Sequence, residues 1–165
     1  MPFAVTHMLV PMILLDFLID KILKIKRSKL PNKYILIAGI AGLLPDIDIP
    51  LSLVFGSTFI THRSITHTVW LPLTFLLFSS VFYFFKKHQL SAIFLMAFIG
   101  TSIHITLDLI TAGVIPVFYP LSRSLIGLNL IPVSSATTFY ASLDAVLLFL
   151  YFIRIGLRKK VQDIV

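Results

Sequence analysis

Five apolar segments of this 165-residue chain are each about as long as a helix that crosses a membrane. A bilayer core requires roughly 20 apolar residues of helix, because a helix satisfies its own backbone hydrogen bonds where no water is available. The segments lie at about residues 3–20, 35–55, 69–85, 91–111 and 139–157. They predict an all-α, polytopic integral membrane protein with about five transmembrane helices, organised as a single domain over residues 1–165.

Composition narrows the chemistry that such a chain can perform. Hydrophobic residues make up 58% of the sequence and the mean hydropathy is +0.99, which excludes an ordinary soluble domain. The chain contains no Cys and no Glu, so neither disulfides nor thiolate metal sites are available. Histidine and aspartate are therefore the only strong ligands that it offers to a transition metal.

The net charge of +7 indicates topology rather than nucleic-acid binding. All Lys and Arg residues except Arg63 and Arg123 lie within residues 21–33, at residues 86–87, or within residues 154–160. They flank the apolar segments and do not interleave with aromatic residues on a polar surface. Because short basic loops remain cytoplasmic, we predict a multi-pass inner (plasma) membrane protein with its N-terminus outside and its C-terminus in the cytoplasm.

The stretch from about residue 112 to 138 is apolar but is punctuated by turn-forming residues. Its glycines and prolines are Gly113, Pro116, Pro120, Gly127 and Pro132. Both residue types interrupt helices, because proline lacks the backbone N–H and glycine loses the most conformational entropy on ordering. We interpret this stretch as a candidate re-entrant or interfacial segment.

The ionisable residues within or beside the apolar segments gather toward one membrane face. A charged side chain at the bilayer centre costs at least about 2.5–3.5 kcal/mol, so such residues are candidates for function. The predicted topology places eight of them toward the extracytoplasmic side: His7, Asp46, Asp48, His62, His67, His104, Asp108 and Asp144. This gathering is the main indication of a functional site.

The sequence around residues 45–50 favours metal binding by a pair of carboxylates. Pro45 and Pro50 are expected to break or distort the second helix. If the backbone there is extended or turn-like, Asp46 and Asp48 can point at a common cation, because residues two apart then lie on the same side.

Two further pairs have the spacing of joint ligands. His104 and Asp108 are four residues apart, which places both side chains on one face of a helix. His62 and His67 are five residues apart and do not share a helix face, so they require a loop or a helix start to converge.

The remaining ionisable residues have simpler interpretations. Asp16 and Asp20 lie beside lysines at the cytoplasmic end of the first segment, where a salt bridge or a hydrated helix end explains them. His88 is interpreted as a loop residue. Arg63 and Arg123, the only basic residues on the extracytoplasmic side, are candidates for binding an anionic group of a substrate through bidentate hydrogen bonds.

The motifs taken together resemble those of a known family. A histidine near the N-terminus, LLPDID, HRSITH and IHITLDLITAGVIPVFYPLSRS follow one another between residues 7 and 127. In this combination they resemble the YdjM-like family of membrane-bound metal-dependent hydrolases, with Ser64 where glycine is expected in many relatives. The resemblance implies metal-binding or catalytic roles for His7, Asp46, Asp48, His62, His67, His104 and Asp108.

We therefore hypothesise a metal-dependent hydrolase that acts on a lipid or amphiphilic phosphoester at the extracytoplasmic face, with membrane lipid as environment and candidate substrate. One or two divalent ions would bind, and the prominence of histidine favours Zn²⁺. The candidate ligands are His7, Asp46, Asp48, His67, His104 and Asp108, and the candidate catalytic residues are His62 and Asp48. Two alternatives remain open, namely a metal-ion carrier or sensor and a structural membrane protein that uses the same His–Asp pairs to hold helices together.

Overall fold

The computed structural model describes residues 4–22, 30–55, 65–111, 113–131 and 133–162, and contains only helices and loops within these ranges. Helix α1 (Ala4–Phe17) continues as one π-helical turn, η1 (Leu18–Ile22). The following elements are α2 (Asn32–Ala41), the short 3₁₀ helix η2 (Pro45–Ile47), α3 (Asp48–Phe55), α4 (Trp70–Phe84), α5 (His88–Thr111) and α6 (Val133–Gln162).

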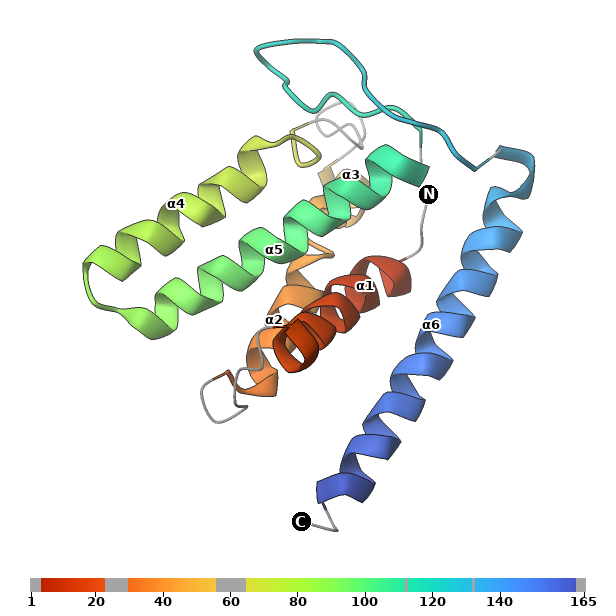
Figure 1. Ribbon diagram of the computed structural model, residues 1–165. Coiled ribbons are helices and arrows are strands. Elements are labelled where there is room, and N and C mark those ends of the chain that lie inside the picture. The colour runs from red at the N-terminus through yellow and green to blue at the C-terminus, as the bar shows by residue number, and fades with distance from the viewer. Residues whose placement is uncertain (1–3, 23–29, 56–64, 112, 132, 163–165) are drawn as a thin grey trace.

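Helix α5 is the central element of the fold. It packs against α4, α2 and α1, whereas α6 packs against α1 at the side of the bundle (Figure 1). A hydrophobic core of residues from α1, η1, α2 and α5 fills the space between these elements, and its largest members include Met12, Ile19, Tyr34 and Met96. This packing brings the N-terminal end of α1, the C-terminal end of α2 and the C-terminal end of α5 together.

The predicted apolar segments all form helices, but five membrane spans are not confirmed. By length and hydropathy, α5 and α6 are candidate spans, and α2 with η2 and α3 forms a third if the bent pair counts as one. Helix α4 contains 15 residues, and α1 contains 14 before it continues as η1. At about 1.5 Å per residue, a helix of 15 residues is roughly 22 Å long, which is shorter than the roughly 30 Å hydrocarbon core.

The chain bends by 47° between α2 and the η2–α3 segment. Helix α2 ends at Ala41, and Pro45 begins η2, as expected for a residue that cannot donate a backbone hydrogen bond to the preceding turn. Pro50 lies in the first turn of α3, where a missing N–H removes no bond within the helix. The predicted break is therefore confirmed, and it results from Pro45.

The described part of the predicted re-entrant or interfacial segment, residues 113–131, is an irregular loop that crosses the ends of α4 and α5 (Figure 1). Backbone hydrogen bonds tie it to both helices, from Val69 N to Val117 O (2.9 Å) and from Leu128 N to Leu109 O (2.7 Å). Beneath it, Ile115 and Val117 pack against Ile105 of α5. The end of the predicted segment is helical because α6 begins at Val133.

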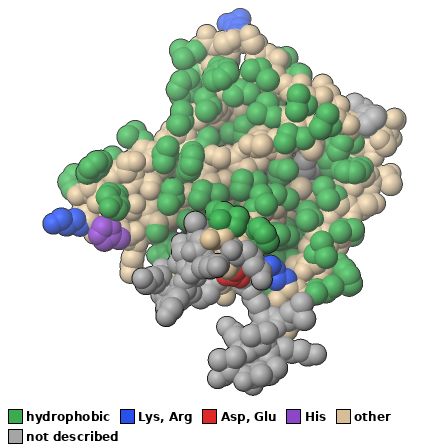
Figure 2. All heavy atoms as spheres, in the orientation of Figure 1, with side chains coloured by type: hydrophobic (Ala, Val, Ile, Leu, Met, Phe, Trp, Pro, Cys, Tyr) green, Lys and Arg blue, Asp and Glu red, His purple; other side chains and the backbone are tan. Residues whose placement is uncertain are grey.

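The surface of the protein is largely hydrophobic. Figure 2 shows hydrophobic side chains spread over the described part of the visible face and few charged ones. The most exposed large apolar side chains include Leu53 on α3 and Phe84 on α4, at 83% and 82%. Such exposure is unfavourable in water and is typical of helices that face lipid.

Candidate metal centre

Four side chains from three separate parts of the chain converge at one end of the bundle. Asp46 comes from η2, His67 from the turn before α4, and His104 and Asp108 from the last two turns of α5. His67 Nε2 lies 3.4 Å from Asp46 Oδ1, 3.4 Å from Asp108 Oδ2 and 3.3 Å from His104 Nε2. His104 Nε2 lies 3.7 Å from Asp46 Oδ1 and 3.8 Å from Asp108 Oδ2.

These separations fit side chains that share one metal ion. Zinc forms bonds of about 2.0–2.2 Å to nitrogen and oxygen, so the ligand atoms of a four-coordinate site lie roughly 3.3–3.6 Å apart. Two overlapping groups, His7 with Asp46 and His104, and His67 with His104 and Asp108, have ligand atoms within 4.8 Å of one another. Asp46 Oδ1 has no hydrogen-bond partner among the described residues, as expected of an atom that binds an ion. The buried His and Asp groups can therefore hold a metal ion.

The cluster is almost completely shielded from solvent. His67, His104 and Asp108 have no exposed side-chain surface, whereas 17% of the Asp46 side chain is exposed. Burying ionisable groups at this density is unfavourable unless they pair with one another or bind a cation. Asp46 is therefore the most solvent-exposed of these four side chains.

The position of His104 depends on a close approach between α5 and α2. The Nδ1 atom of His104 lies 2.6 Å from the carbonyl oxygen of Gly42, at the end of α2. Since a carbonyl oxygen only accepts hydrogen bonds, Nδ1 carries the proton and Nε2 presents its lone pair to the cluster. One turn earlier on α5, Gly100 lies so close to α2 that a Cβ atom would overlap the Ala38 carbonyl oxygen.

His7 completes the cluster from α1. Its ring stacks on His104 with the ring centroids 3.8 Å apart, and its Nε2 lies 3.5 Å from Asp108 Oδ1. Within the described residues, neither ring nitrogen of His7 makes a hydrogen bond. His7 thus differs from His104, whose Nδ1 is held by a backbone acceptor.

The carboxylates control the charge of His67, which lies in the turn before α4. Burial alone would lower the pKa of the ring, but the neighbouring Asp108 and Asp46 outweigh this effect and raise the pKa of His67 to about 9. His67 is therefore an imidazolium at neutral pH when no metal is bound, and a metal ion has to displace its Nε2 proton.

Comparison with known proteins places the chain in a family. The family model described as YdjM inner membrane protein matches residues 1–161. The chain belongs to the YdjM inner membrane protein family. No curated protein and no solved structure gives a significant match. The family resemblance that the motifs indicated is thus confirmed, and the exposed apolar helices fit a YdjM-family membrane protein.

Asp46 and Asp48 lie on different sides of His67 in this YdjM-family protein. Asp46 Oδ1 faces Nε2, whereas Asp48 Oδ2 is 3.6 Å from Nδ1. The expectation that both carboxylates point at one ion assumed an extended or turn-like backbone. The backbone is helical here, and residues two apart on a helix point in nearly opposite directions.

Two further candidate residues that the structure describes, Arg123 and Asp144, lie outside the cluster. Arg123 is an exposed residue of the 113–131 loop, and Asp144 of α6 accepts a hydrogen bond from Thr6, next to His7. His62 and Arg63 lie outside the described residues. Two groups that the sequence did not single out contact the cluster, namely the Thr66 hydroxyl and the Gly42 carbonyl. Neither group could be recognised from the sequence, because a single threonine hydroxyl and a backbone carbonyl oxygen form no motif.

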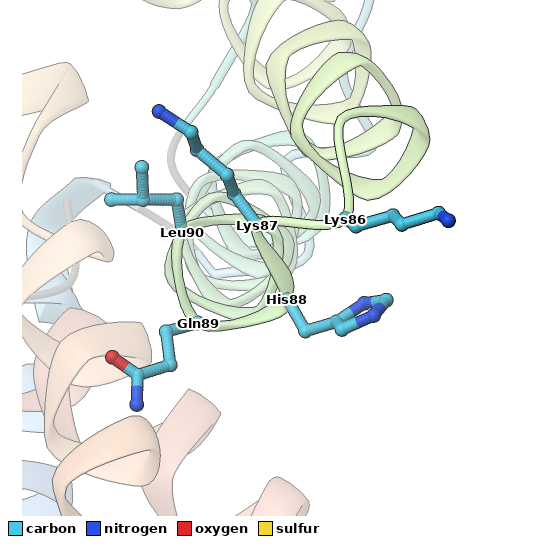
Figure 3. A pocket seen from close by; sticks show the side chains of 5 residues that line it. All are labelled: Lys86, Lys87, His88, Gln89 and Leu90. Atoms are coloured by element: carbon cyan, nitrogen blue, oxygen red, sulfur yellow. The ribbon is translucent and has the colours of Figure 1, made fainter.

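The remaining ionisable residues that the sequence singled out lie away from the cluster. Asp16 and Asp20 form ion pairs with Arg154 of α6, at 3.3 Å for Asp20. The side chains of the neighbouring lysines that the sequence suggested, Lys21 and Lys24, lie outside the described part of the structure. His88 is the first residue of α5 and not a loop residue as expected. It lies next to Lys86 and Lys87, where a cavity of about 420 Å³ is open to the exterior. The side chains there point away from one another, so they do not form a converging set of ligands (Figure 3).

Proposed function

We propose that this YdjM-family protein is a membrane-bound metal-dependent hydrolase that acts on a lipid or another amphiphilic phosphoester at the extracytoplasmic face of the membrane. The observation that carries this proposal is the buried cluster of two histidines and two aspartates whose ligand atoms are spaced for a single ion. A cluster of this kind is expensive to bury without a cation, and a YdjM-family chain without Cys or Glu has no stronger ligands to offer.

One ion is a better fit to the cluster than two. The two overlapping ligand groups share His104. With its Nδ1 proton directed at the Gly42 carbonyl, His104 has a single lone pair, on Nε2, and can serve only one ion. We assign Asp46, His67, His104 and Asp108 as its ligands and favour Zn²⁺, which commonly binds histidine and carboxylate together. A bound zinc ion would polarise a phosphoester and lower the pKa of a coordinated water to about 7.

His7 is suited to proton transfer beside this ion. Histidines that bind metals usually donate their second ring N–H to a fixed acceptor, which orients the ring. His104 has such an acceptor, but neither nitrogen of His7 makes a hydrogen bond within the described structure. His7 Nε2 can therefore accept a proton as the general base, and Asp108 Oδ1, 3.5 Å away, stabilises the resulting imidazolium.

The surroundings of the cluster favour an amphiphilic substrate. The 113–131 loop exposes Leu121, Leu125, Leu128 and Leu130, each by at least 60%. Exposed apolar area disfavours contact with water by roughly 25 cal/mol per Å², so this loop is more stable against lipid. Arg123 in the same loop offers a cation for a phosphate group. A substrate with an apolar tail and an anionic head matches both features.

The extracytoplasmic location rests on the distribution of basic residues along the helices. Lys86 and Lys87 precede α5, and His104 follows the start of α5 by about 24 Å of helix. Lys33 likewise lies at the start of α2, whereas the cluster lies beyond its end. By the positive-inside rule the basic ends are cytoplasmic, which orients the cluster outward, the N-terminus outside and the C-terminus inside.

The test is metal content combined with hydrolysis. Protein purified in detergent should contain about one equivalent of zinc and release phosphate or a phosphorylated headgroup from at least one member of a panel of phospholipids and phosphorylated isoprenoids. His104→Ala and Asp108→Asn should abolish both properties, whereas His88→Ala is the matched control and should retain both. If the wild-type protein and the two site variants hold the same amount of metal, the assigned centre is wrong.

Complete burial of three ligands also suits a metal-ion carrier or sensor, since such a site needs no room for a substrate. Stoichiometric zinc without hydrolysis of any member of the panel would favour that function. A protein that binds no metal would favour the structural alternative, in which the His–Asp pairs only hold helices together.

A further inference from the structure

We propose that Asp48 and Thr66 are positioning residues that fix the ring of His67, with the proton on Nδ1 and the lone pair of Nε2 directed at the metal centre. Neither residue would touch the ion. The inference deepens the proposed function and rests on the part of it that makes the cluster a metal centre. It replaces the sequence-based role of Asp48 as a ligand or catalytic residue.

Two polar groups, the Thr66 hydroxyl and the Asp48 carboxylate, form a short hydrogen-bonded chain behind the ring of His67. Thr66 Oγ1 donates a hydrogen bond to Asp48 Oδ2 at 2.9 Å and lies 3.1 Å from His67 Nδ1. Asp48 Oδ2 itself lies 3.6 Å from the same nitrogen. Asp48 is 1% exposed and His67 is fully buried, so water does not compete effectively for these contacts.

The direction of these hydrogen bonds follows from which groups carry a proton that they can donate. An ionised carboxylate only accepts, so the single hydroxyl proton of Thr66 is directed at Asp48. The same hydroxyl oxygen can then contribute only a lone pair to His67, which requires Nδ1 to be the donor. A neutral imidazole carries one proton. With this proton on Nδ1, Nε2 is left with the lone pair that a metal ion needs.

The two nitrogens of His67 thus face different partners. Nε2 lies 3.4 Å from both Asp46 Oδ1 and Asp108 Oδ2, which belong to the cluster, whereas Nδ1 faces Thr66 and Asp48. The helical backbone across residues 45–48 produces this division, because it directs Asp46 and Asp48 to opposite sides of the imidazole.

Each of the two assigned histidine ligands therefore has its own hydrogen-bond acceptor for the Nδ1 proton. For His104 it is the Gly42 carbonyl at 2.6 Å, and for His67 it is the Thr66 hydroxyl backed by Asp48. Outer partners of this kind fix ring orientation and raise the basicity of the ligand nitrogen, and their loss typically weakens metal binding by about 10–100-fold.

The experiment measures zinc affinity by competition with a chromophoric chelator, using the full-length protein in detergent. Thr66→Val removes the hydroxyl at nearly constant volume, and Thr66→Ser is the matched control that keeps it. We expect zinc binding to weaken by about 10–100-fold in Thr66→Val and to stay within about twofold of wild type in Thr66→Ser. Asp48→Asn keeps an acceptor but removes the charge, and should weaken binding less than Thr66→Val.

Nitrogen NMR of the histidine rings in the zinc-loaded wild-type protein provides a second readout that needs no variant. We expect the proton of His67 on Nδ1 and the metal on Nε2. Metal bound through Nδ1, or wild-type zinc affinity in Thr66→Val, would overturn the proposal. If Asp48 is itself a ligand, Asp48→Asn loses zinc while Thr66→Val does not. Zinc binding without hydrolysis refutes only the proposed reaction, whereas a wild-type protein that binds no zinc refutes this inference as well.

Discussion

The close approach of α5 to α2 at Gly100 allows a direct test of how packing supports the metal centre. In Gly100→Ala, the added Cβ would overlap the Ala38 carbonyl oxygen and lie 3.0 Å from the backbone nitrogen of Gly42. Both neighbours are backbone atoms, so no side-chain rotation can relieve the overlap. Small residues at helix crossings in membrane proteins commonly allow such close packing.

The size of the effect follows from the distances. Restoring ordinary van der Waals contact requires α5 to move away from α2 by roughly 1 Å. The hydrogen bond from His104 Nδ1 to Gly42 O, now 2.6 Å, would lengthen to about 3.6 Å, beyond the range of an effective hydrogen bond. Overpacking should lower the free energy of unfolding by about 1–3 kcal/mol. Loss of the fixed His104 ring should weaken zinc binding by about 10–100-fold.

Gly156→Ala is the matched control, because a Cβ at Gly156 meets no other atom within 4 Å. Chemical unfolding in detergent and zinc competition, applied to both variants, should show losses in Gly100→Ala and changes of about 0.5 kcal/mol or less in Gly156→Ala. If Gly100→Ala binds zinc as the wild type does, the Gly42 carbonyl does not orient His104, and the link between helix packing and the centre is refuted.

Three further predictions address the proton carrier, pH and the α1–α6 contact. His7→Gln should keep its zinc but lose hydrolysis by about 10²–10⁴-fold, and loss of zinc equal to that in His104→Ala would instead make His7 a ligand. Because zinc displaces a proton from His67, whose pKa is raised to about 9, the dissociation constant for zinc should fall by about tenfold per pH unit up to pH 9 and level off above it. A zinc dissociation constant that does not change between pH 6 and 8 would exclude His67 as a ligand. Arg154→Gln removes the cation that Asp16 and Asp20 share, and chemical unfolding should show a free energy of unfolding lower by about 1–3 kcal/mol. Chelator competition should show that the zinc affinity of the folded protein is unchanged.

The sequence predicts local features of the site well, because these depend on neighbouring residues. Apolar runs locate each helix, Pro45 marks the bend, and the four-residue spacing brings His104 Nε2 within 3.8 Å of Asp108 Oδ2. The gathering of His7, His67 and Asp46 at the same end also follows from the order of the apolar segments, since alternate helices begin and end at the same side.

What the sequence leaves undetermined depends on dihedral angles and on distant partners. Whether Asp46 and Asp48 share an ion or face apart is decided by the helical backbone at Pro45, which the PDID motif alone does not specify. The contact between Asp16 and Arg154 joins residues 138 apart in sequence, and no periodicity in the sequence predicts it. The short helix α4 shows that an apolar segment does not translate directly into a membrane span.

The contacts between α1 and α6 have a consequence for biosynthesis. Thr6 pairs with Asp144 and Asp16 with Arg154, both at a sequence separation of 138, so the two helices run parallel in a fixed register. All the side chains assigned to the proposed metal centre, however, come from the first 108 residues. The nascent chain therefore has its complete ligand set before α6 leaves the ribosome, and α6 can arrive last to hold α1, and His7 with it, in place.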